Sequence, residues 1–458
     1  MSLRERETLC KEAEVTPSVV LAQHEHLFHL LNSLLPTSIA AEDKLDPRHF
    51  QRDRIFTVDV LTFSILHLIS DQNNFGYQHI LQTLWKKLKE LEIVAVSAAA
   101  PQKSSFCKAR RKLPEKYIKE MFSRAVERSN QVEPQRLWRG HRLFAVDGMK
   151  VSLPLSAELK EHFGCPKVTN GEAHYPQALL SELFNVLTDE VHDFTSSPYT
   201  ADEREQAILH LSHLREGDIM INDRNYPSYE LFWECRKRKI HFVMRMPLGH
   251  WKIIEEFLAS GAVDQCVTLN MTARARELYK NDPTVPKQMT VRLIRVTLTT
   301  GETEVLVTSL LNRKKYPTKA LQELYPLRWP IEEGNKSVKC HQAIEKFHAK
   351  DVNGIHQEVN AHYLLMAITR LFMLQAAITE RTPEQYYGLS YKSAVDFVSN
   401  DLVVLVLSKK KWLKKRTITE ILIMIAKVYE KPRYHRSYPR WSRCSRRKYR
   451  QRHARPVS

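Results

Sequence analysis

The spacing of apolar residues changes near residue 140 of this 458-residue chain. From about residue 18 to residue 130, apolar side chains recur every three or four positions, which is the period of helices with one buried face. Strand-like alternation is almost absent there. Residues 1–138 are therefore predicted to form an all-helical amino-terminal domain. The positions that carry this period are Leu27, Leu30, Leu31, Leu34, Val58, Leu61, Ile65, Leu68, Ile80, Leu81, Leu84 and Leu88.

A strand pattern begins after His141. Leu143 to Val146 is a short apolar run that ends at Asp147-Gly148, and Met149 to Leu153 is predicted to return as a second strand. Hairpin strands followed by alternating helices and strands are the α/β mixture of a ribonuclease H-like core, and residues 139–246 are predicted to be its first part. The later elements are predicted as strands at 179–188, 190–196, 218–223 and 240–246 and helices at 201–214 and 229–239.

A β-rich insertion is predicted at residues 247–324. β-branched residues alternate in 290–297 and 302–309, on either side of Thr300-Gly301, which indicates two strands. Trp251 is the only tryptophan of this block. It is interpreted as a core residue rather than as a stacking platform for a ligand, because large aromatic side chains usually serve packing.

The last part of the chain is predicted to hold final core helices at 325–380, then a carboxy-terminal helical region and a basic tail at 381–458. Lys and Arg number 70 against 52 Asp and Glu, a net charge of +18, and residues 431–455 carry 11 of these charges with no acid. Such a tail suits a polyanion, because neutralised phosphates release counterions. Aromatic residues among its arginines favour nucleic acid, although a solvated charged terminus is the alternative reading.

Cysteine usage and the amino terminus predict a soluble, cytoplasmic protein. The seven cysteines are scattered without paired spacing, which argues against a disulfide framework and a zinc ribbon. The first residues are charged and do not resemble a secretory signal. No apolar run is long enough to span a bilayer. No phosphate-binding glycine pattern is present, so nucleotide hydrolysis is not indicated.

A short basic segment, Ser104 to Lys112, is a candidate DNA-reading helix. Its serines are expected to cap a helix that carries Lys108, Arg110, Arg111 and Lys112. A preceding helix and a short connector fit a helix-turn-helix loosely. The alternative is an ordinary surface helix, since basic residues are common on such surfaces.

The most informative segment runs from Tyr325 to Lys339. The step of seven residues from Glu332 to Lys339 drifts by only about 20° around a helix, so these two side chains are predicted to project from one helix face together with Arg328. Pro330 is tolerated only in the first turn, so the helix is predicted to begin no earlier than about Arg328, with Tyr325 in the loop before it. The alternative is a solvated helix start whose acids complement the helix dipole.

The order Tyr, two residues, Arg, three residues, Glu, six residues, Lys resembles the signature of DDE transposases of the insertion-sequence-four family. The resemblance covers roughly residues 140–375. It implies a transposase that cleaves DNA at insertion-sequence ends and transfers the strands into target DNA, by a mechanism that uses two Mg²⁺ ions, for which Mn²⁺ can substitute. It also implies double-stranded DNA as partner and a homodimer in the synaptic complex.

The resemblance assigns the site residues as well. Asp147, Asp223 and Glu332 are expected to be the catalytic metal ligands. The expected DNA phosphate-binding residues are Tyr325, Arg328 and Lys339. Glu333 is the nearest rival of Glu332, but it lies about 100° round the helix and breaks the six-residue gap to Lys339.

Each aspartate also has a simpler local reading. Asp147-Gly148 has the composition of a hairpin turn, and Asp223 with the residues after it suits an ordinary turn between strand and helix. If the two preceding strands are adjacent in one sheet, both carboxylates emerge at the same edge. Two other functions remain open: a related metal-dependent DNA nuclease or resolvase, and a non-catalytic DNA-binding protein derived from a transposase.

Overall fold

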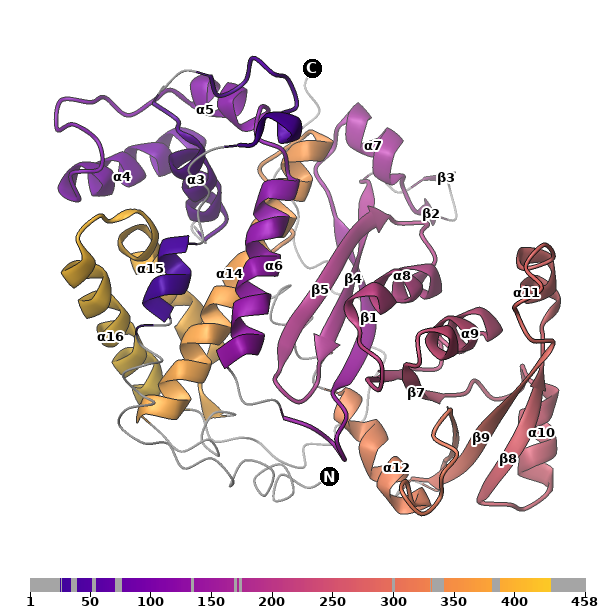
Figure 1. The fold of residues 1–458 in the computed structure, drawn as a ribbon. Coiled ribbons are helices and arrows are strands. Elements are labelled where there is room, and N and C mark those ends of the chain that lie inside the picture. Colours follow the sequence, from indigo (N-terminus) through magenta and orange to yellow (C-terminus); the bar gives the residue numbers. More distant parts are fainter. Residues whose placement is uncertain are drawn as a thin grey trace.

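One mixed sheet forms the centre of the protein in the computed structural model (Figure 1). The order of its eight strands is β5-β4-β1-β6-β7-β10-β9-β8. The strands are β1 (Leu143–Ser152), β4 (Gln177–Asn185), β5 (Glu190–Pro198), β6 (Ile219–Asn222), β7 (His241–Arg245), β8 (Asp264–Asn270), β9 (Gln288–Thr297) and β10 (Thr303–Thr308). The structure describes residues 25, 27–33, 39–51, 55–70, 76–132, 136–168, 171–172, 175–298, 301–329, 331, 342–380 and 388–429.

The strand directions define the fold class. β1, β4 and β5 form an antiparallel meander, whereas β6 and β7 run parallel to β1 on its other side. This order of three antiparallel and two parallel strands is that of a ribonuclease H-like fold, so the predicted α/β class is confirmed. The turn between β4 and β5 places Asp189 at a φ of 55°, a left-handed conformation that aspartate tolerates.

Helices cover both faces of the sheet (Figure 1). Leu143 and Ala145 of β1 face one apolar core, which includes residues of α6 and α14. Phe144 and Val146 face a second core, formed with α8 and α9. This alternation follows from the two-residue period of a strand. The helices around the sheet are α6 (Lys116–Val132), α7 (Ala157–Phe163), α8 (Glu203–His210), α9 (Tyr229–Lys237) and α14 (Val352–Glu380).

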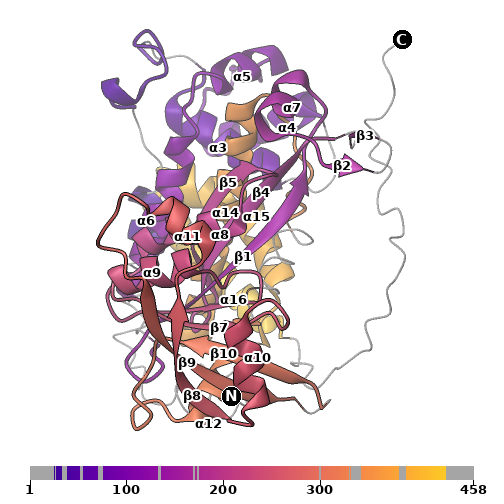
Figure 2. The same ribbon diagram turned by 90° about the vertical axis from the view of Figure 1, so that its right-hand side faces the viewer.

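The β-rich insertion continues the central sheet. β10 pairs with β7 and with β9, and β9 pairs with β8, so the insertion lies at the far end of the sheet from α5 and α7 (Figure 2). To the two predicted strands the structure adds β8 and three helices, α10 (Lys252–Ala259), α11 (Ala273–Leu278) and α12 (Thr318–Leu324). Trp251 lies at the start of α10 and packs, partly buried, against the second core.

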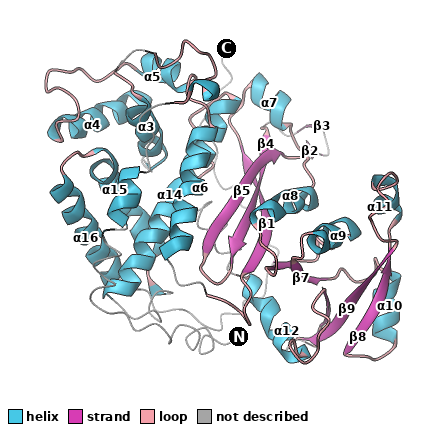
Figure 3. Ribbon diagram, viewed as in Figure 1, coloured by secondary structure: helices cyan, strands magenta, loops and turns pink. Residues whose placement is uncertain are grey.

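The helices before and after the sheet gather on one side of the molecule (Figure 3). Their buried residues belong to one apolar cluster, which also includes residues of β1, β4 and β5. None of the described helices combines the length and the hydropathy needed to cross a membrane. The helices of this group are α3 (Val58–Ser70), α4 (Tyr77–Glu90), α5 (Lys103–Arg110), α15 (Tyr391–Leu407) and α16 (Lys411–Lys427), together with α6 and α14.

The structure corrects the interpretation of the basic segment at residues 104–112. α5 starts at Lys103, and its N-cap is Gln102, whose side chain makes no capping hydrogen bond; the backbone N–H of Lys103 instead donates to Oε1 of Gln78 at 2.9 Å. Arg110 is buried, and its guanidinium forms an ion pair of 2.7 Å with Glu358 of α14. Arg110 therefore ties α5 to the interior, because a buried charge needs a buried partner. Only its exposed neighbours, such as Arg111, face solvent.

Candidate active site

Asp147 and Asp223 lie at the same edge of the sheet. β1 and β6 are adjacent and parallel, with Ala145 opposite Ile221. The backbone N–H of Val146 donates to Oδ1 of Asn222 at 3.1 Å, which links the two strands just beyond their last paired residues. Asp147 follows on β1, and Asp223 is the first residue after β6. The two aspartates are thus level with each other at the carboxyl end of β6.

The prediction that Asp147 ends a strand and that Asp147-Gly148 forms a turn is wrong. β1 continues to Ser152, with Asp147 opposite Glu182 and Gly148 opposite Ser181 on β4. A Cβ atom on Gly148 would lie 3.1 Å from Cδ of Glu203 and 3.2 Å from Cδ1 of Leu179. Glycine is therefore favoured here by the close approach of α8, as often happens inside strands.

Enlarging residue 148 is expected to destabilise the protein in proportion to the added volume. Gly148→Ala requires Glu203 and Leu179 to shift by a few tenths of an ångström, whereas Gly148→Val adds two further methyl groups. We expect Val to lower the free energy of unfolding by about 1–3 kcal/mol and Ala by less. Thermal unfolding of both variants checks this. Equal stability of the Val variant and the wild type would contradict the close packing of α8 on β1.

The segment that carries Tyr325 and Arg328 is helical, which corrects the prediction that Tyr325 lies in the loop before the next helix. α12 (Thr318–Leu324) leads directly into the 3₁₀ helix η3 (Tyr325–Arg328). Pro326 occupies the first turn of η3, where a missing N–H leaves no hydrogen bond unmade. Tyr325 therefore follows α12 in helical conformation and does not lie in an approach loop.

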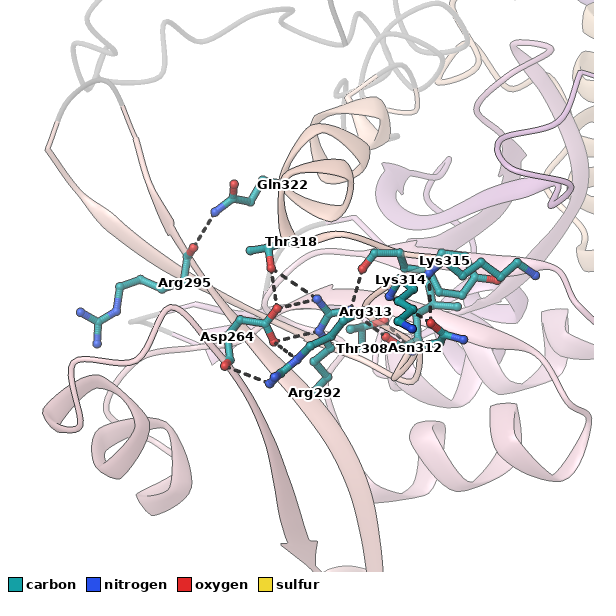
Figure 4. Close-up of polar contacts among 12 residues, drawn as sticks. Asp264, Arg292, Arg295, Thr308, Asn312, Arg313, Lys314, Lys315, Thr318 and Gln322 are labelled. Carbon is teal, nitrogen blue, oxygen red and sulfur yellow. Dashed lines mark hydrogen bonds and ion pairs between the residues drawn. The ribbon is translucent and has the colours of Figure 1, made fainter.

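A buried polar cluster fixes the start of α12 (Figure 4). Arg292 of β9 is fully buried and donates to both carboxylate oxygens of Asp264, at 2.9 and 2.5 Å. Its guanidinium also donates to the backbone oxygen of Tyr316 at 2.8 Å. Thr318 donates to Asp264 as well, at 2.5 Å. The insertion strands β8 and β9 thus hold the helix that leads to Tyr325 and Arg328.

The Asp147 carboxyl is in an environment that disfavours its charge. Its pKa is raised from the usual 3.8 to about 6, chiefly by burial and to a lesser extent by the nearby carboxylates of Asp223 and Glu203. The backbone N–H of Gly148, at 3.0 Å from Oδ1, and the guanidinium of Arg328 act in the opposite direction. Since an added positive charge would relieve this repulsion, the edge is suited to a cation.

Tyr325 belongs to the same electrostatic environment. Burial raises its pKa to about 12, with Arg328 and Arg245 acting to lower it and Asp223 and Glu304 acting to raise it. Tyr325 therefore keeps its proton at neutral pH. Arg245, at the end of β7, forms an ion pair of 2.5 Å with Glu304 of β10. The structure thus brings Asp147, Asp223, Tyr325 and Arg328 together.

The other two predicted residues, Glu332 and Lys339, lie outside the described residues. Within the described ranges, no three histidine, cysteine or acidic side chains converge closely enough to hold a metal ion. Asp147 and Asp223 are the two expected metal ligands that the structure describes. They supply hard carboxylate oxygens, which are the ligands that Mg²⁺ prefers.

The sequence analysis did not identify two residues of this edge. Glu203, in the first turn of α8, lies over Gly148, and Tyr226 follows Asp223 by three residues. Glu203 is one of the charges that raise the pKa of Asp147, and the pKa of Tyr226 is raised by burial and then by Asp147, Glu203 and Asp223. Acidic residues are common in the first turn of a helix, so the sequence around Glu203 did not mark it as a site residue. The only sequence feature related to its position is the glycine at 148, against which its side chain packs.

Comparisons with known proteins agree with this geometry. The family model described as "Transposase DDE domain" matches residues 138–369. The transposase InsG for insertion sequence element IS4 of Escherichia coli (strain K12) is 24% identical over 241 residues, 52% of this chain and 52% of that protein. The chain therefore matches about half the length of this relative. A cryo-EM structure of a piggyBac transposase synaptic complex with hairpin DNA aligns with a TM-score of 0.42 and 9% identity, covering 92% of this chain and 85% of that chain.

Proposed function

Because the chain belongs to the transposase DDE domain family, we propose that it cleaves DNA at the ends of an insertion sequence and joins those ends to target DNA. The observation that carries this proposal is the level placement of Asp147 and Asp223 at one sheet edge, with Arg328 acting on the Asp147 carboxyl. If Asp147 were only a turn residue and Asp223 only a capping residue, the two carboxylates would have no reason to lie level with each other at one sheet edge.

The site would hold divalent cations, with Mg²⁺ as the expected species and Mn²⁺ as a substitute. Asp147 and Asp223 would bind them together with Glu332, the third expected ligand. The raised pKa of Asp147 fits this role, because its like-charged neighbours favour a bound cation. When two such ions are bound, they polarise the scissile phosphate and lower the pKa of the attacking water.

The cationic side chains would hold the DNA backbone. Arg328 offers a planar fork that matches two phosphate oxygens, and Lys339 offers a compact charge. Tyr325, which stays protonated, would donate a hydrogen bond to a phosphate oxygen. These contacts would orient the phosphodiester at the element end for attack by water, which leaves a 3′-hydroxyl on that end. They would then orient this hydroxyl for its attack on target DNA. Neither step needs a covalent enzyme intermediate.

The remaining regions would serve DNA binding and assembly. We assign DNA-end binding to residues 1–138, where Lys108 of α5 and Arg111, the residue after α5, are exposed. The tail at residues 431–455 would contribute nonspecific phosphate contacts. Joining two element ends requires two active sites, so the working form would be a homodimer on double-stranded DNA. In a bacterial host it would act in the cytoplasm, at the nucleoid.

Incubation with DNA that carries the sequences flanking its own gene tests the proposal. We expect cleavage at the element ends with Mg²⁺ or Mn²⁺, no cleavage with EDTA, and joined products when target plasmid is present. Cleavage without joined products would identify a hydrolytic nuclease instead. Binding of the ends without cleavage under any of these conditions would identify a DNA-binding protein derived from a transposase.

A further inference from the structure

The turn before β1 holds an arginine in a conformation that arginine rarely adopts. Trp138 and His141 exchange backbone hydrogen bonds of 2.8 and 2.9 Å, which close a tight hairpin turn. Its two central residues, Arg139 and Gly140, have φ angles of 49° and 85°. A turn with two left-handed residues favours Asn-Gly, and a long side chain at its first position is unfavourable. Such an outlier points to a function for Arg139.

The guanidinium of Arg139 lies against a loop that is distant in the sequence. Its Nη1 donates to the backbone oxygen of Lys315 at 3.3 Å. The ring of Trp138 stacks on the ring of Tyr316, with centroids 6.1 Å apart. The Arg139 guanidinium lies over the Trp138 ring, 5.6 Å from its centroid. Nζ of Lys315 lies over the Tyr316 ring at 5.2 Å. A stacked aromatic pair therefore supports two neighbouring basic residues.

The loop that carries Lys315 is held in one arrangement. Oδ1 of Asn312 accepts from the backbone N–H groups of Lys314 and Lys315, each at 3.0 Å. The backbone N–H of Tyr316 donates to the backbone oxygen of Asn312 at 2.8 Å. The buried Arg292 donates to the backbone oxygen of Tyr316 at 2.8 Å (Figure 4). Because the loop is already ordered, a ligand that binds it has little ordering cost to meet.

The side chains that the turn and the loop present to solvent are basic. Arg139, Arg313, Lys314 and Lys315 are all exposed, and we call these four residues the basic surface. Arg313 forms an ion pair of 3.3 Å with Asp264. In the part of the chain that the structure describes, the other three form no ion pair with a carboxylate. Neighbouring positive charges repel one another, so an anion that bridges them is favoured.

The basic surface lies at the end of the sheet opposite to Asp147 and Asp223. Arg139 precedes β1, to which β6 and β7 are parallel. β10 runs antiparallel to β7, so the loop that follows β10 lies at the amino end of β7. From His141 to Asp147 an extended chain covers about 20 Å. A DNA duplex spans this distance with roughly six base pairs.

From this placement we infer that the basic surface binds the phosphate backbone of double-stranded DNA, roughly 20 Å from the acidic edge. A guanidinium and two ammonium groups suit phosphate oxygens. Trp138 and Tyr316 are only 8% and 5% exposed, so their rings are not accessible for stacking on bases. The contact is therefore to the backbone and independent of sequence. The inference rests on the proposed function, to which it adds a second DNA contact outside the acidic edge.

The first test is Arg139→Asn in the full-length protein. Asparagine suits the first position of this turn, so the midpoint of thermal unfolding should equal or exceed that of wild type. Affinity for a fluorescently labelled duplex that carries one element end is measured by anisotropy at several salt concentrations. The slope of log affinity against log salt should decrease by about 0.9, the effect of one lost phosphate contact. A lower midpoint with unchanged affinity would show that Arg139 serves only the fold.

The second test removes two charges and leaves the backbone of the loop intact. Lys314→Gln with Lys315→Gln keeps both backbone hydrogen bonds to Asn312 and should decrease the slope by about 1.8. The matched control is Lys252→Gln with Lys280→Gln. These two lysines are exposed, and each pairs with a nearby glutamate, at 3.6 and 2.7 Å. The control should keep a slope close to that of wild type.

The outcomes separate this inference from the proposed function. Both double variants should cleave saturating DNA at the wild-type rate, because neither changes the acidic edge. Equal slopes for the two double variants, with normal cleavage by wild type, would overturn the inference alone. Failure of the wild-type protein to bind the duplex would overturn the inference together with the proposed function.

Discussion

Replacing Asp147 by asparagine is expected to slow DNA cleavage by roughly three orders of magnitude while leaving DNA binding intact. The change removes one carboxylate charge and one hard ligand from the proposed cation site, and metal-assisted stabilisation of the transition state amounts to several kcal/mol. Single-turnover cleavage and a binding titration at fixed salt separate the two effects. Glu332→Gln should behave in the same way, and cleavage at the wild-type rate by either variant would remove the proposed site.

Asp147→Asn is also expected to stabilise the metal-free protein at neutral pH. The folded-state pKa of Asp147 is raised to about 6. The stability that comes from keeping this carboxyl protonated is therefore fully present below about pH 4 and is lost as the pH rises through 6. Ionised Asp147 then destabilises the fold by on the order of 2 kcal/mol at pH 7.5. Asparagine does not ionise. Thermal unfolding in EDTA should show Asp147→Asn above wild type at pH 7.5, with the difference gone near pH 4.

The second large effect is expected at Arg110. Its guanidinium pairs with Glu358 at 2.7 Å, and the two side chains are 6% and 1% exposed. It also donates to Gln357 and to the backbone oxygen of Gly354, each at 2.7 Å. Arg110→Met leaves the Glu358 charge buried without its main partner, which typically costs about 3–5 kcal/mol. Chemical unfolding should therefore show a severe loss of stability.

Arg111→Met provides the control, because it removes the same charge from an exposed position next along the chain. It should leave stability within about 0.5 kcal/mol of wild type. The double variant Arg110→Met with Glu358→Gln should recover much of the loss, since no uncompensated charge remains. Equal stability of the Arg110 and Arg111 variants would show that the ion pair between α5 and α14 contributes nothing.

Local periodicity was sufficient to predict most of the core. β4, β5, β6 and α9 were expected close to their observed bounds, because their apolar residues alternate or recur in patterns that burial requires. β8 was not expected, since only Leu269 of its seven residues is buried. Such a strand has no apolar alternation to signal it.

Other errors arose where distant residues decide the outcome. Asp147-Gly148 suggested a turn, but the side chain of Glu203 on α8 is what favours glycine within β1. Arg110 suggested a surface for DNA, but a glutamate far along the chain, Glu358, buries it. Asp147 and Asp223 were expected at the same sheet edge only if β1 and β6 are neighbours, and in the observed sheet they are. Pairing between strands that are distant in sequence is not visible in local patterns.

The apolar core that α3 and α16 share bears on biosynthesis. Residues of α3 and of α16 belong to one apolar cluster. Because α16 comes much later in the chain, α3 leaves the ribosome long before all of its packing partners have been synthesised. At roughly 5–20 residues per second, this delay is on the order of 20–70 s. A polypeptide interrupted before α14 would expose this apolar surface to proteases and to aggregation. Prematurely terminated chains should therefore be degraded before they could compete with the full-length chain for the DNA that we propose it binds.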